Sequence, residues 1–384
     1  MSRVSAPAQP TARVGIIGGG QLARMSHAAG TPLGIETHVL DAPGAPAEAA
    51  GARLVVGTAD RLDDLARLAR RVDVVTFDHE HADPAALQAL AARGVTIRPG
   101  PEVKRLAQDK LHARRRLGGD LGLPVPAFTS VQDVSEVRAF AAAHGWPVVL
   151  KAISGGYDGR GVRIAADVAE AEAALAALGR PALAEAHVAI DTELSVLVAR
   201  AAGTGESRAY PVVETLQQDG ICHEVVLPAR VPGALAARAH ALALELAEAI
   251  ELEGLLAVEL FVAGDELLIN ELALRPHNSG HVTLDGCVTS QFEQHLRAVL
   301  GWPLGATRPV APAAAMVNVL GPADGSDPGH RVARALAVEG AHVHLYGKAP
   351  RPGRKLGHVT ALGADADAAL DAARTAARIL EGER

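Results

Sequence analysis

The sequence predicts a chain of mixed α/β and α+β class built from three units, and three observations indicate this. Apolar strand-like runs alternate with helical stretches over roughly the first hundred residues, which is typical of a parallel sheet covered on both faces. In the middle of the chain, strand-like runs follow one another without an intervening helix, which favours an antiparallel sheet. The last part contains two strand-like runs and an alanine-rich helix, which predict a small β-rich unit.

Composition restricts both the fold and the partners. The 384 residues favour two or three domains, and 49% hydrophobic with 21% charged residues excludes a globally disordered or fibrous chain. Only 3% of the residues are aromatic, so the core is expected to consist of Ala, Leu and Val. A net charge of −7 provides no overall basic field for nucleic acid, so an anionic ligand must be bound by local cations.

The sequence favours a cytoplasmic location without membrane contact. Cys222 and Cys287 are too few for a disulfide framework or a multi-thiolate metal site, which fits a reducing compartment. No apolar run reaches the roughly 18–20 residues that a membrane span requires. Residues 1–12 lack the apolar core of a signal peptide and are expected to form a short disordered leader.

The first unit is predicted over residues 13–103. A buried strand beginning at Val14 leads into a glycine turn and the start of a helix. Further strands are expected at 37–41, 53–57 and 72–77, with helical stretches between them, for example at 61–71. The Pro- and Gly-rich run at 98–102 ends the unit. This alternation predicts a parallel sheet with helices on both faces.

The second unit is predicted over residues 104–302, and the third over 303–384. A basic helical stretch at 104–117 is followed by an extended linker at 122–128, because two prolines exclude a helix there. Strands are expected at 146–153, 182–190 and 193–202, the last two in one antiparallel sheet. A helix at 235–251 precedes a β-hairpin over 255–275 that turns at 263–266. The third unit is expected to contain strands at 314–321 and 341–347 and a final helix.

Three glycines, Gly18 to Gly20, follow the first strand. They fit the dinucleotide-binding fingerprint, and Asp41 ends the second strand at a suitable distance along the chain. Glycines let the backbone approach a ligand, and the N-terminus of the following helix attracts an anion. A tight structural turn explains the same residues equally well, so this motif leaves both interpretations open.

A glycine-rich loop, SGGYDGRG at 154–161, follows a strand that carries Lys151. Such a loop beside a lysine suits a phosphate group, because backbone N–H groups surround the oxygens and the ammonium group adds positive charge. A mobile surface hairpin is the alternative. Tyr157, Asp158 and Arg160 are more specific than a spacer loop requires, which favours a ligand-binding loop.

Two glutamates, Glu259 and Glu271, lie on facing strands of the predicted hairpin. A carboxylate inside an apolar strand is costly to bury unless it is paired or bound to a metal. With the amide of Asn278 they form a cluster of hard oxygen ligands, which suits Mg²⁺ that phosphates also bind. Either glutamate alone could face solvent, but two of them beside one turn favour the metal site.

Two further runs are rich in polar side chains. The run RPHNSGH at 275–281 predicts a ligand-lining loop; zinc binding by His277 and His281 would need a helix, which Pro276 and Gly280 disfavour. The run Asp-His-Glu-His at 78–81 also allows a metal site. It follows the C-terminal end of a strand, where open α/β sheets bind ligands, and this favours a ligand-binding edge.

Three cations near the C-terminus, Lys348, Arg354 and Lys355, lie in a turn-rich segment. Clustered cations suit a phosphate monoester. A solvated basic loop is the alternative.

These motifs, in this order, resemble one family of the ATP-grasp superfamily, the 5-(carboxyamino)imidazole ribonucleotide synthases. The resemblance extends from about Val14 to Gly363. It rests on the runs IIGGGQLARM, LKAISGGYDGRGVRI, ELSVLVAR, YPVVE, INELALRPHNSGHVTLDGCVTSQFEQHLRAVLGWPLG and RKLGHV. It implies an ATP-grasp fold with an N-terminal Rossmann-like domain of the biotin-carboxylase type, a lid subdomain at about 125–190 and a small C-terminal β-rich domain.

The resemblance also implies a reaction. ATP phosphorylates bicarbonate to carboxyphosphate, and the exocyclic amine of 5-aminoimidazole ribonucleotide takes up the carboxyl group, giving ADP and phosphate in de novo purine biosynthesis. ATP and Mg²⁺ are the implied cofactors, and a homodimer is the implied assembly. The motifs fit this chemistry independently, because phosphoryl transfer needs cations and labile carboxyphosphate needs a closing lid.

On the nucleotide side, the resemblance implies a role for each residue in turn. Lys110 and Lys151 would bind phosphates, Glu259 and Glu271 would bind Mg²⁺, and Asn270 would neighbour the nucleotide. The lid over the triphosphate would comprise Gly155, Gly156, Tyr157, Asp158, Gly159, Arg160 and Gly161. The hinge whose backbone reads adenine would comprise Glu185, Ala186, His187 and Val188, with Glu193 on the ribose hydroxyls.

On the substrate side, the resemblance implies that Arg275 and His277 face bicarbonate or carboxyphosphate, with Asp158 as a third catalytic residue. The ribonucleotide would contact Gln21, Leu22, Glu80, Tyr157, Arg160, Asn278 and Ser279, and its phosphate would contact Lys348, Arg354 and Lys355.

Four departures from the family pattern bear on activity. Where the family usually has Glu-Phe-Glu-Asn, this chain has Asp-His-Glu-His at 78–81. Three single residues also differ: Gln217 stands in place of a histidine, Lys110 in place of an arginine, and Leu274 in place of a proline. None removes an implied metal ligand, so an active enzyme is expected.

Three alternative functions remain. The nearest is a formate-dependent glycinamide ribonucleotide transformylase of the same superfamily, which HNSGH and RKLGH disfavour. A nicotinamide-dependent dehydrogenase would rest only on residues 18–41. A non-catalytic nucleotide-binding regulator would need no carboxylate pair.

Overall fold

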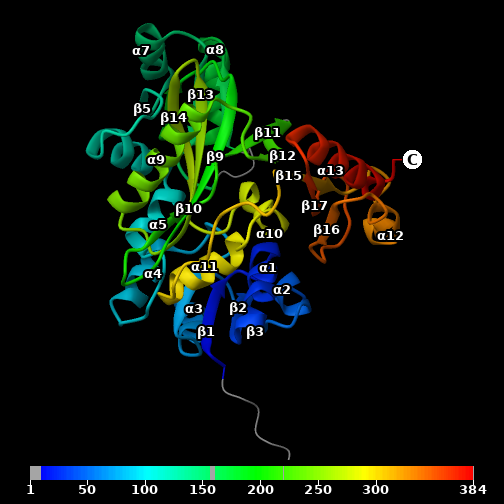
Figure 1. Cartoon of the computed structure of the whole chain (residues 1–384). Helices are drawn as coiled ribbons and strands as arrows, with labels where there is room; N and C mark the ends of the chain where they lie inside the picture. Colours follow the sequence, from blue (N-terminus) through cyan, green and yellow to red (C-terminus); the bar gives the residue numbers. More distant parts are fainter. Residues whose placement is uncertain (1–9, 156–160, 219, 384) are drawn as a thin grey trace, which may run out of the picture.

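The N-terminal part of the computed structural model is a parallel sheet, as predicted. The structure describes residues 10–155, 161–218 and 220–383. The strands β1 (Ala12–Ile17), β2 (Ile35–Asp41), β3 (Arg53–Val56) and β4 (Val74–Phe77) lie in the order β3-β2-β1-β4. The helices are α1 (Gln21–Gly30), α2 (Pro46–Ala49), α3 (Leu62–Ala69) and α4 (Pro84–Ala91), with a 3-10 turn η1 (Thr31–Leu33). This unit lies at the bottom of Figure 1.

The basic helical stretch predicted at 104–117 is confirmed, except that Asp109 divides it. The chain forms α5 (Pro101–Gln108), α6 (Lys110–Arg114) and a π-helical turn η2 (Arg115–Asp120). Asp109 interrupts the helix with extended backbone angles (φ −127°, ψ 101°), and its carboxylate accepts a hydrogen bond from the backbone N–H of His112. The carboxylate thereby satisfies an amide that the first turn of α6 leaves unpaired, so a new helix begins here. The predicted extended linker is confirmed, because residues 122–127 are neither helix nor strand.

Residues 128–186 form a separate antiparallel sheet, which we call the lid sheet. Its strands β5 (Phe128–Val131), β8 (Ala182–Ala186), β6 (Val148–Ala152) and β7 (Val162–Ala165) lie in the order β5-β8-β6-β7, and α7 (Val134–His144) and α8 (Val168–Leu178) pack on it. It lies at the top of Figure 1. The expectation that 182–190 and 193–202 share one sheet is wrong. The chain leaves the lid sheet after β8, and the next strand belongs to the central sheet.

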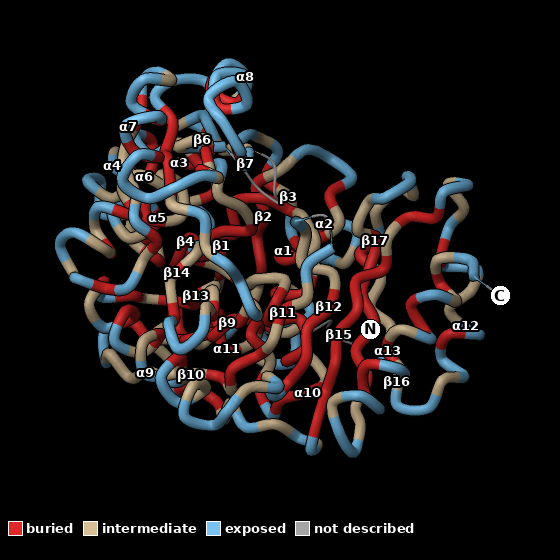
Figure 2. Tube along the Cα trace, turned by 90° about the horizontal axis from the view of Figure 1, so that it is seen from above, coloured by how far each residue is buried: buried red, intermediate tan, exposed pale blue. Residues whose placement is uncertain are grey.

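The central sheet is antiparallel and has the order β14-β13-β9-β11-β12-β15-β17-β16, with β10 paired to β9. Its strands are β9 (Thr192–Arg200), β10 (Ser207–Ala209), β11 (Val213–Gln218), β12 (Ile221–Leu227), β13 (Gly254–Ala263), β14 (Glu266–Ala273), β15 (Ala313–Leu320), β16 (Ala341–Leu345) and β17 (Lys355–Gly363). The predicted hairpin of β13 and β14 is confirmed. Figure 2 shows that burial follows the strands of this sheet.

Two helices connect the central sheet to its surroundings. The predicted helix α9 (Gly233–Ala249) is confirmed and packs through small apolar side chains on one side of the sheet. Helix α11 (Gln291–Leu300) lies between the two main sheets, because Ala298 contacts the central core while Leu296 and Val299 contact the N-terminal core. The two sheets therefore share a buried helix, which fixes their loops around a common space.

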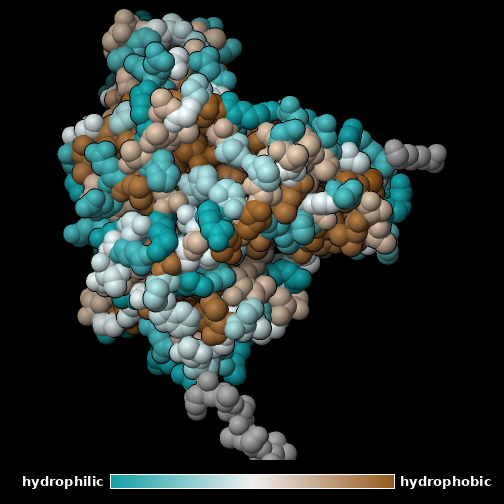
Figure 3. Space-filling model, in the orientation of Figure 1, coloured by the Kyte–Doolittle hydropathy of each residue, from teal (hydrophilic) through white to brown (hydrophobic). Residues whose placement is uncertain are grey.

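The C-terminal strands extend the central sheet. The two expected strands are present as β15 and β16, and β17 lies between them as an additional strand. Helix α13 (Ala366–Glu381) packs on β15 and β17. The remaining short elements are η3 (Asn278–Gly280), α10 (Thr283–Gly286), η4 (Pro328–Arg331) and α12 (Val332–Ala335). Figure 3 shows this lobe projecting to one side, with hydrophobic and hydrophilic residues interspersed over the visible face. Within the described ranges, no helix has both the length and the apolar character that crossing a membrane requires.

Candidate active site

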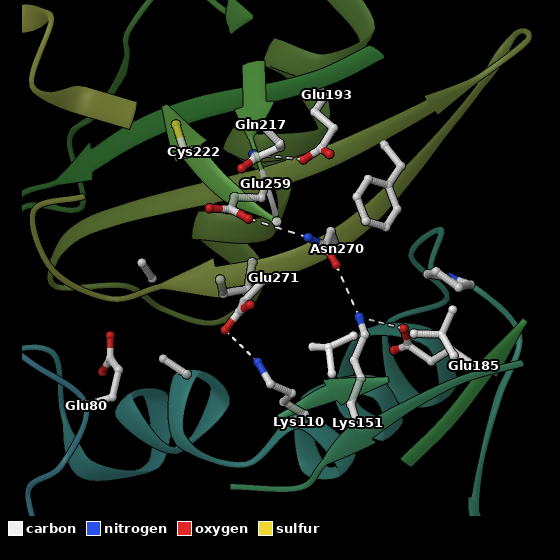
Figure 4. Close-up of a pocket in the computed structure, with 18 of the residues that line it drawn as sticks. Glu80, Lys110, Lys151, Glu185, Glu193, Gln217, Cys222, Glu259, Asn270 and Glu271 are labelled. Atoms are coloured by element: carbon white, nitrogen blue, oxygen red, sulfur yellow. Dashed lines mark hydrogen bonds and ion pairs between the residues drawn. The ribbon is translucent and has the colours of Figure 1, made fainter. Parts of the chain in front are cut away.

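A cavity of about 640 Å³ lies where the lid sheet, the central sheet and the loop after β4 meet. Its size is typical of a site for a small ligand or cofactor. The predicted site residues that line it are Glu80, Lys110, Lys151, Gly155, Glu185, Ala186, His187, Val188, Glu193, Glu259, Asn270, Glu271, Arg275, His277, Asn278 and Lys355. Figure 4 shows that several of their side chains point toward one another from different elements. The fold thus brings together residues that are up to 275 positions apart, from Glu80 to Lys355.

The structure describes only the ends of the predicted lid. Gly156, Tyr157, Asp158, Gly159 and Arg160 lie outside the described residues. On either side of them, Gly155 lines the cavity, and the carbonyl of Gly161 accepts a hydrogen bond from the backbone N–H of Ala152. The roles that the sequence suggests for these five residues stay predictions.

A buried charge network lies at the lid-sheet end of the cavity. The Lys151 Nζ atom is 2.7 Å from one Glu185 oxygen, and the Arg114 Nε atom is 2.5 Å from the other. Burial raises the pKa of Glu185, but Lys151 and Arg114 outweigh this effect and hold that pKa below its ordinary value. Arg114 also donates to the Asn270 carbonyl at 2.6 Å, and Lys151 to the Asn270 side-chain oxygen at 3.3 Å. The network therefore ties α6, the lid sheet and β14 together around an ammonium group that faces the cavity (Figure 4).

The segment after β8 forms one wall of the cavity. Ala186, His187 and Val188 line it, and Glu193 follows at the start of β9. Burial raises the pKa of Glu193, while a hydrogen bond from Gln217 at 3.1 Å acts against this rise. The expected histidine position, occupied here by Gln217, thus supplies a donor to this carboxylate.

The two strand glutamates lie opposite each other, as the hairpin pattern predicts. Glu259 pairs in register with Glu271, and a bulge places Asn270 opposite the step from Glu259 to Leu260. In a regular strand, neighbouring side chains point to opposite faces; the bulge lets Asn270 and Glu271 both line the cavity. Two carboxylates and an amide side chain therefore come from one hairpin, with the Asn270 nitrogen toward Glu259 and its oxygen toward Lys151 (Figure 4).

The positive charge near the two glutamates does not fully balance their carboxylates. Burial, together with the nearby charges of Glu271 and Glu193, raises the pKa of Glu259 to about 8. Lys110 lies 2.6 Å from Glu271, and His277 Nε2 lies 3.2 Å from Glu259. Among the described residues, no group of three or more His, Cys, Asp or Glu side chains could hold a metal ion by itself. The pair fits Mg²⁺ as part of a site that bound phosphates complete, because the cation would relieve the repulsion between carboxylates.

At the opposite end of the cavity, Glu80 lies between two cations. One Glu80 oxygen is ion-paired with Lys104, and the other is 3.0 Å from Arg275 Nε. Gln108 donates to the Glu80 carbonyl at 2.8 Å. His79, beside Glu80, also lines the cavity, and burial together with nearby positive charge lowers its pKa to about 4. The segment after β4 therefore presents a fixed carboxylate and a neutral imidazole to the cavity.

The loop after β14 holds His277 in one orientation. Ser279 donates through its backbone N–H to His277 Nδ1 at 3.3 Å, so this nitrogen carries a lone pair and Nε2 carries the proton toward Glu259. The Ser279 hydroxyl is hydrogen-bonded to Nδ1 and to Ser195, both at 2.8 Å, and Ser279 is fully buried. Ser279 therefore lies behind His277 and does not line the cavity. The Gln291 side chain bonds both main-chain polar atoms of His277.

The glycine turn after β1 is filled by the protein's own carboxylates. The Asp78 side chain accepts from the backbone N–H groups of Gly20 at 2.7 Å and Ala23 at 3.0 Å, and Asp41 accepts from Gly19 at 2.7 Å. A Cβ atom on Gly20 would lie 2.4 Å from an Asp78 oxygen, so a side chain there would collide with Asp78. The amides that would bind a dinucleotide pyrophosphate are thus occupied, and the structure favours the tight structural turn.

The predicted residues of the C-terminal cation group are only partly close together. Lys348 donates to the Gln21 side chain, and Lys355 lines the cavity at the start of β17. Arg354 donates to the Ala349 carbonyl at 3.1 Å and does not line the cavity. The Leu22 side chain is buried in an apolar cluster with Met25, Phe292 and Tyr346. Gln21 and Lys348 therefore mark a region beside the main cavity.

The residues that the sequence analysis missed include three polar side chains of one segment: Lys104, Gln108 and Arg114. Lys104 and Arg114 lie in a segment with six Lys or Arg residues within 104–116, which reads as an exposed basic face. One sequence feature could have indicated that this segment is partly buried: Val103, Leu106 and Ala107 make it amphipathic. Only the contacts with distant carboxylates show that these cations point inward.

Comparisons with known proteins agree with this arrangement. The chain matches the ribonucleotide synthetase preATP-grasp domain over residues 11–108, the ATP-grasp domain over 117–292 and the phosphoribosylaminoimidazole carboxylase C-terminal domain over 314–372. It is 47% identical to the N5-carboxyaminoimidazole ribonucleotide synthase of Mycobacterium tuberculosis, over 97% of this chain and 88% of that protein. It is 42% identical to the protein of the same name from Synechococcus elongatus, over 91% and 89% of the two chains.

Solved structures give the same result. The N5-carboxyaminoimidazole ribonucleotide synthetase of Thermus thermophilus has a TM-score of 0.87 at 40% identity, covering 97% of this chain and 99% of that one. The Aspergillus clavatus enzyme, solved with ADP and 5-aminoimidazole ribonucleotide, has a TM-score of 0.88 at 33% identity, covering 96% and 98%. The fold, the cavity and these similarities together show that the chain belongs to the N5-carboxyaminoimidazole ribonucleotide synthase family of ATP-grasp enzymes.

Proposed function

We propose that this chain uses ATP and bicarbonate to carboxylate 5-aminoimidazole ribonucleotide to N5-carboxyaminoimidazole ribonucleotide, with ADP and phosphate as the other products. The observation that carries the proposal is one cavity that holds a buried lysine network, a pair of facing carboxylates and a fixed Glu80. The family name and the ligands of the Aspergillus clavatus structure support the same reaction. Its place would be the de novo synthesis of purine nucleotides, and we propose a cytoplasmic location.

On the nucleotide side, the chain's own residues bind and neutralise phosphate. Lys151 and Lys110 supply positive charge where phosphoryl transfer develops negative charge. The segment 185–188 suits the adenine ring, and Glu193 suits the ribose hydroxyls. Glu259 and Glu271 would hold Mg²⁺ with the phosphates, and the ion would polarise the transferring phosphoryl group. His277 keeps its Nε2 proton on Glu259 and so orients that carboxylate.

On the substrate side, the residues orient the amine and exclude water. Bicarbonate becomes carboxyphosphate when the γ-phosphoryl group moves to one of its oxygens, and the amine then attacks the carboxyl carbon and displaces phosphate. Arg275 supplies positive charge for the carboxyphosphate, and Glu80 accepts a hydrogen bond from the amine. Lys355, which lines the cavity, and Lys348, which contacts Gln21, suit the ribonucleotide phosphate. The glycine-rich segment 154–161 would close the cavity and protect carboxyphosphate from hydrolysis.

The first test is ADP release by the purified chain with ATP and Mg²⁺. Release that needs bicarbonate and rises with 5-aminoimidazole ribonucleotide would support the proposal. Glu271→Gln should abolish this turnover. Release driven by formate and glycinamide ribonucleotide would instead assign the transformylase reaction. Omission of Mg²⁺ tests whether turnover requires the cation. We also propose a homodimer, and light scattering of the purified chain tests this assembly.

A further inference from the structure

A buried lysine outside the cavity contacts the substrate side of the site. Lys104 on α5 is completely buried, and its Nζ atom lies 4.6 Å from the centre of the Phe77 ring. An ammonium group in such a place is costly unless it is paired. Its partner is Glu80, which does line the cavity. Among the described contacts of Lys104, the ion pair with this carboxylate is the one that joins it to the cavity lining.

Helix α5 fixes the same glutamate through its main chain as well. One turn after Lys104, the Gln108 side chain donates to the carbonyls of Glu80 at 2.8 Å and Ala82 at 2.7 Å. From the loop after β14, Arg275 Nε lies 3.0 Å from the second Glu80 oxygen. Each carboxylate oxygen thus faces its own cation. This arrangement leaves the Glu80 side chain little freedom to rotate.

We propose that Lys104 is a positioning residue that holds the Glu80 carboxylate in the orientation required by the amine of the ribonucleotide. The inference rests on the proposed function. A carboxylate oxygen bound by a fixed ammonium group presents its remaining lone pairs in a defined direction, so a substrate N–H meets an acceptor that is already oriented. Lys104 itself touches neither substrate nor nucleotide.

Lys104 is separated from the end of the cavity that is proposed to bind the nucleotide. The described contacts of Lys104 lie at the Glu80 end of the cavity, whereas Lys151 and Glu185 form the lid-sheet end. Loss of Lys104 should therefore impair use of the ribonucleotide and leave ATP binding unchanged. A purely structural role would impair both alike.

A double-mutant cycle of Lys104→Met and Glu80→Gln in the full chain tests this. We expect K104M to lower kcat/KM for 5-aminoimidazole ribonucleotide by about 10-fold or more, with KM for ATP within about twofold of wild type. In the E80Q background the same substitution should change kcat/KM by less than about twofold, because its target is gone. Lys104→Gln keeps an N–H donor toward Glu80 and should retain more activity than K104M.

Thermal unfolding supplies a second readout. E80Q leaves a buried lysine unpaired, so it should melt at a lower temperature than the double variant, which removes both charges. Leu106→Ala on the same helix is the matched control: it opens the packing against the central core but should leave both KM values unchanged.

The outcomes separate the two proposals. A wild-type chain without ribonucleotide-dependent ADP release would overturn the proposed function. An active wild type with K104M unchanged, with KM for ATP raised equally, or with additive effects in the cycle would overturn only the positioning role. If K104M does not fold, K104Q replaces it in the cycle: a smaller fall in kcat/KM that is confined to the ribonucleotide supports the positioning role, and an unchanged kcat/KM or additive effects overturn it.

Discussion

Replacing Glu259 by glutamine should stabilise the ligand-free protein while it abolishes turnover. Burial and the charges of Glu271 and Glu193 raise the pKa of Glu259 to about 8, from an ordinary value of 4.5. Between these two values the folded state binds a proton that the unfolded state lacks. The contribution of Glu259 to wild-type stability therefore falls as pH rises from 4.5 to 8. Glutamine carries no charge, so this loss should disappear from the variant.

The magnitude follows from the same values. Each pH unit contributes about 1.4 kcal/mol, so at pH 7 the interval above 4.5 amounts to about 3 kcal/mol. Glutamine can still accept the proton of His277, but its amide nitrogen would face Asn270, which now donates to Glu259 at 3.4 Å. Loss of that long hydrogen bond costs about 1 kcal/mol. A net gain of about 2 kcal/mol is therefore expected at pH 7, and a net loss of about 1 kcal/mol at pH 4.5, where only the lost hydrogen bond counts.

The assay is urea unfolding of nucleotide-free protein in EDTA at several pH values between 4.5 and 8.5. Glu266→Gln is the matched control, because Glu266 is an exposed carboxylate at the turn end of β14 and its replacement should change stability by less than about 0.5 kcal/mol. The electrostatic reasoning is refuted if E259Q is no more stable than wild type at pH 7, or if the difference does not shrink toward pH 4.5. ADP release should be absent from E259Q under all these conditions.

Three further predictions concern the described contacts. Arg114→Met leaves Glu185 with one of its two cations, so stability should fall by about 3 kcal/mol and ADP binding should weaken; an unchanged unfolding midpoint would contradict this. Gly20→Ala forces a Cβ atom against Asp78 and should cost about 2 kcal/mol in unfolding experiments, whereas Gly233→Ala, where no atom lies within 4 Å, should be neutral. ADP at about 100 times its Kd should add about 2.7 kcal/mol of stability with Mg²⁺. Equal stabilisation in EDTA would argue against the carboxylate pair as a metal site.

Local patterns in the sequence were sufficient to predict the carboxylate hairpin. Apolar residues on both sides of Gly264 and Asp265 define two strands and their turn, so the two glutamates must lie on adjacent strands. The bulge at Asn270 could not be predicted, because a bulge depends on how the two strands align. That bulge determines which side chains share the cavity.

Contacts between distant segments escaped prediction. A lysine in a helical stretch normally faces solvent, and nothing near Lys104 in the sequence indicates that Glu80 lies beside it in space. The same holds for Asp78 and the amide of Gly20. The glycine run alone therefore leaves a dinucleotide site and a self-capped turn equally plausible, and only the tertiary structure separates them.

The C-terminal strand β17 was not predicted, because its composition is unusual for a strand. Gly357 and His358 interrupt an otherwise apolar run, and the preceding Arg354 and Lys355 suggest a basic turn. In the structure, Gly357 and His358 both fit a strand that lies between two others. Gly357 accommodates close backbone approach, since a Cβ there would lie 2.5 Å from the His344 carbonyl, and His358 bonds the Tyr346 hydroxyl. Pairing partners, rather than local propensity, determine this strand.

The pairing of β12 with β15 has a consequence for dissecting the protein. A fragment ending at Trp302 would lack β15, β16 and β17, and would expose the hydrogen-bonding edge of β12 from Glu224 to Leu227. It would also lose Arg374, which binds both oxygens of Glu224 at 2.8 and 2.7 Å. An uncovered apolar strand edge recruits strands from other chains. The shortest fragment suited to ligand-binding or crystallisation work therefore has to retain the C-terminal strands, even when only the nucleotide site is of interest.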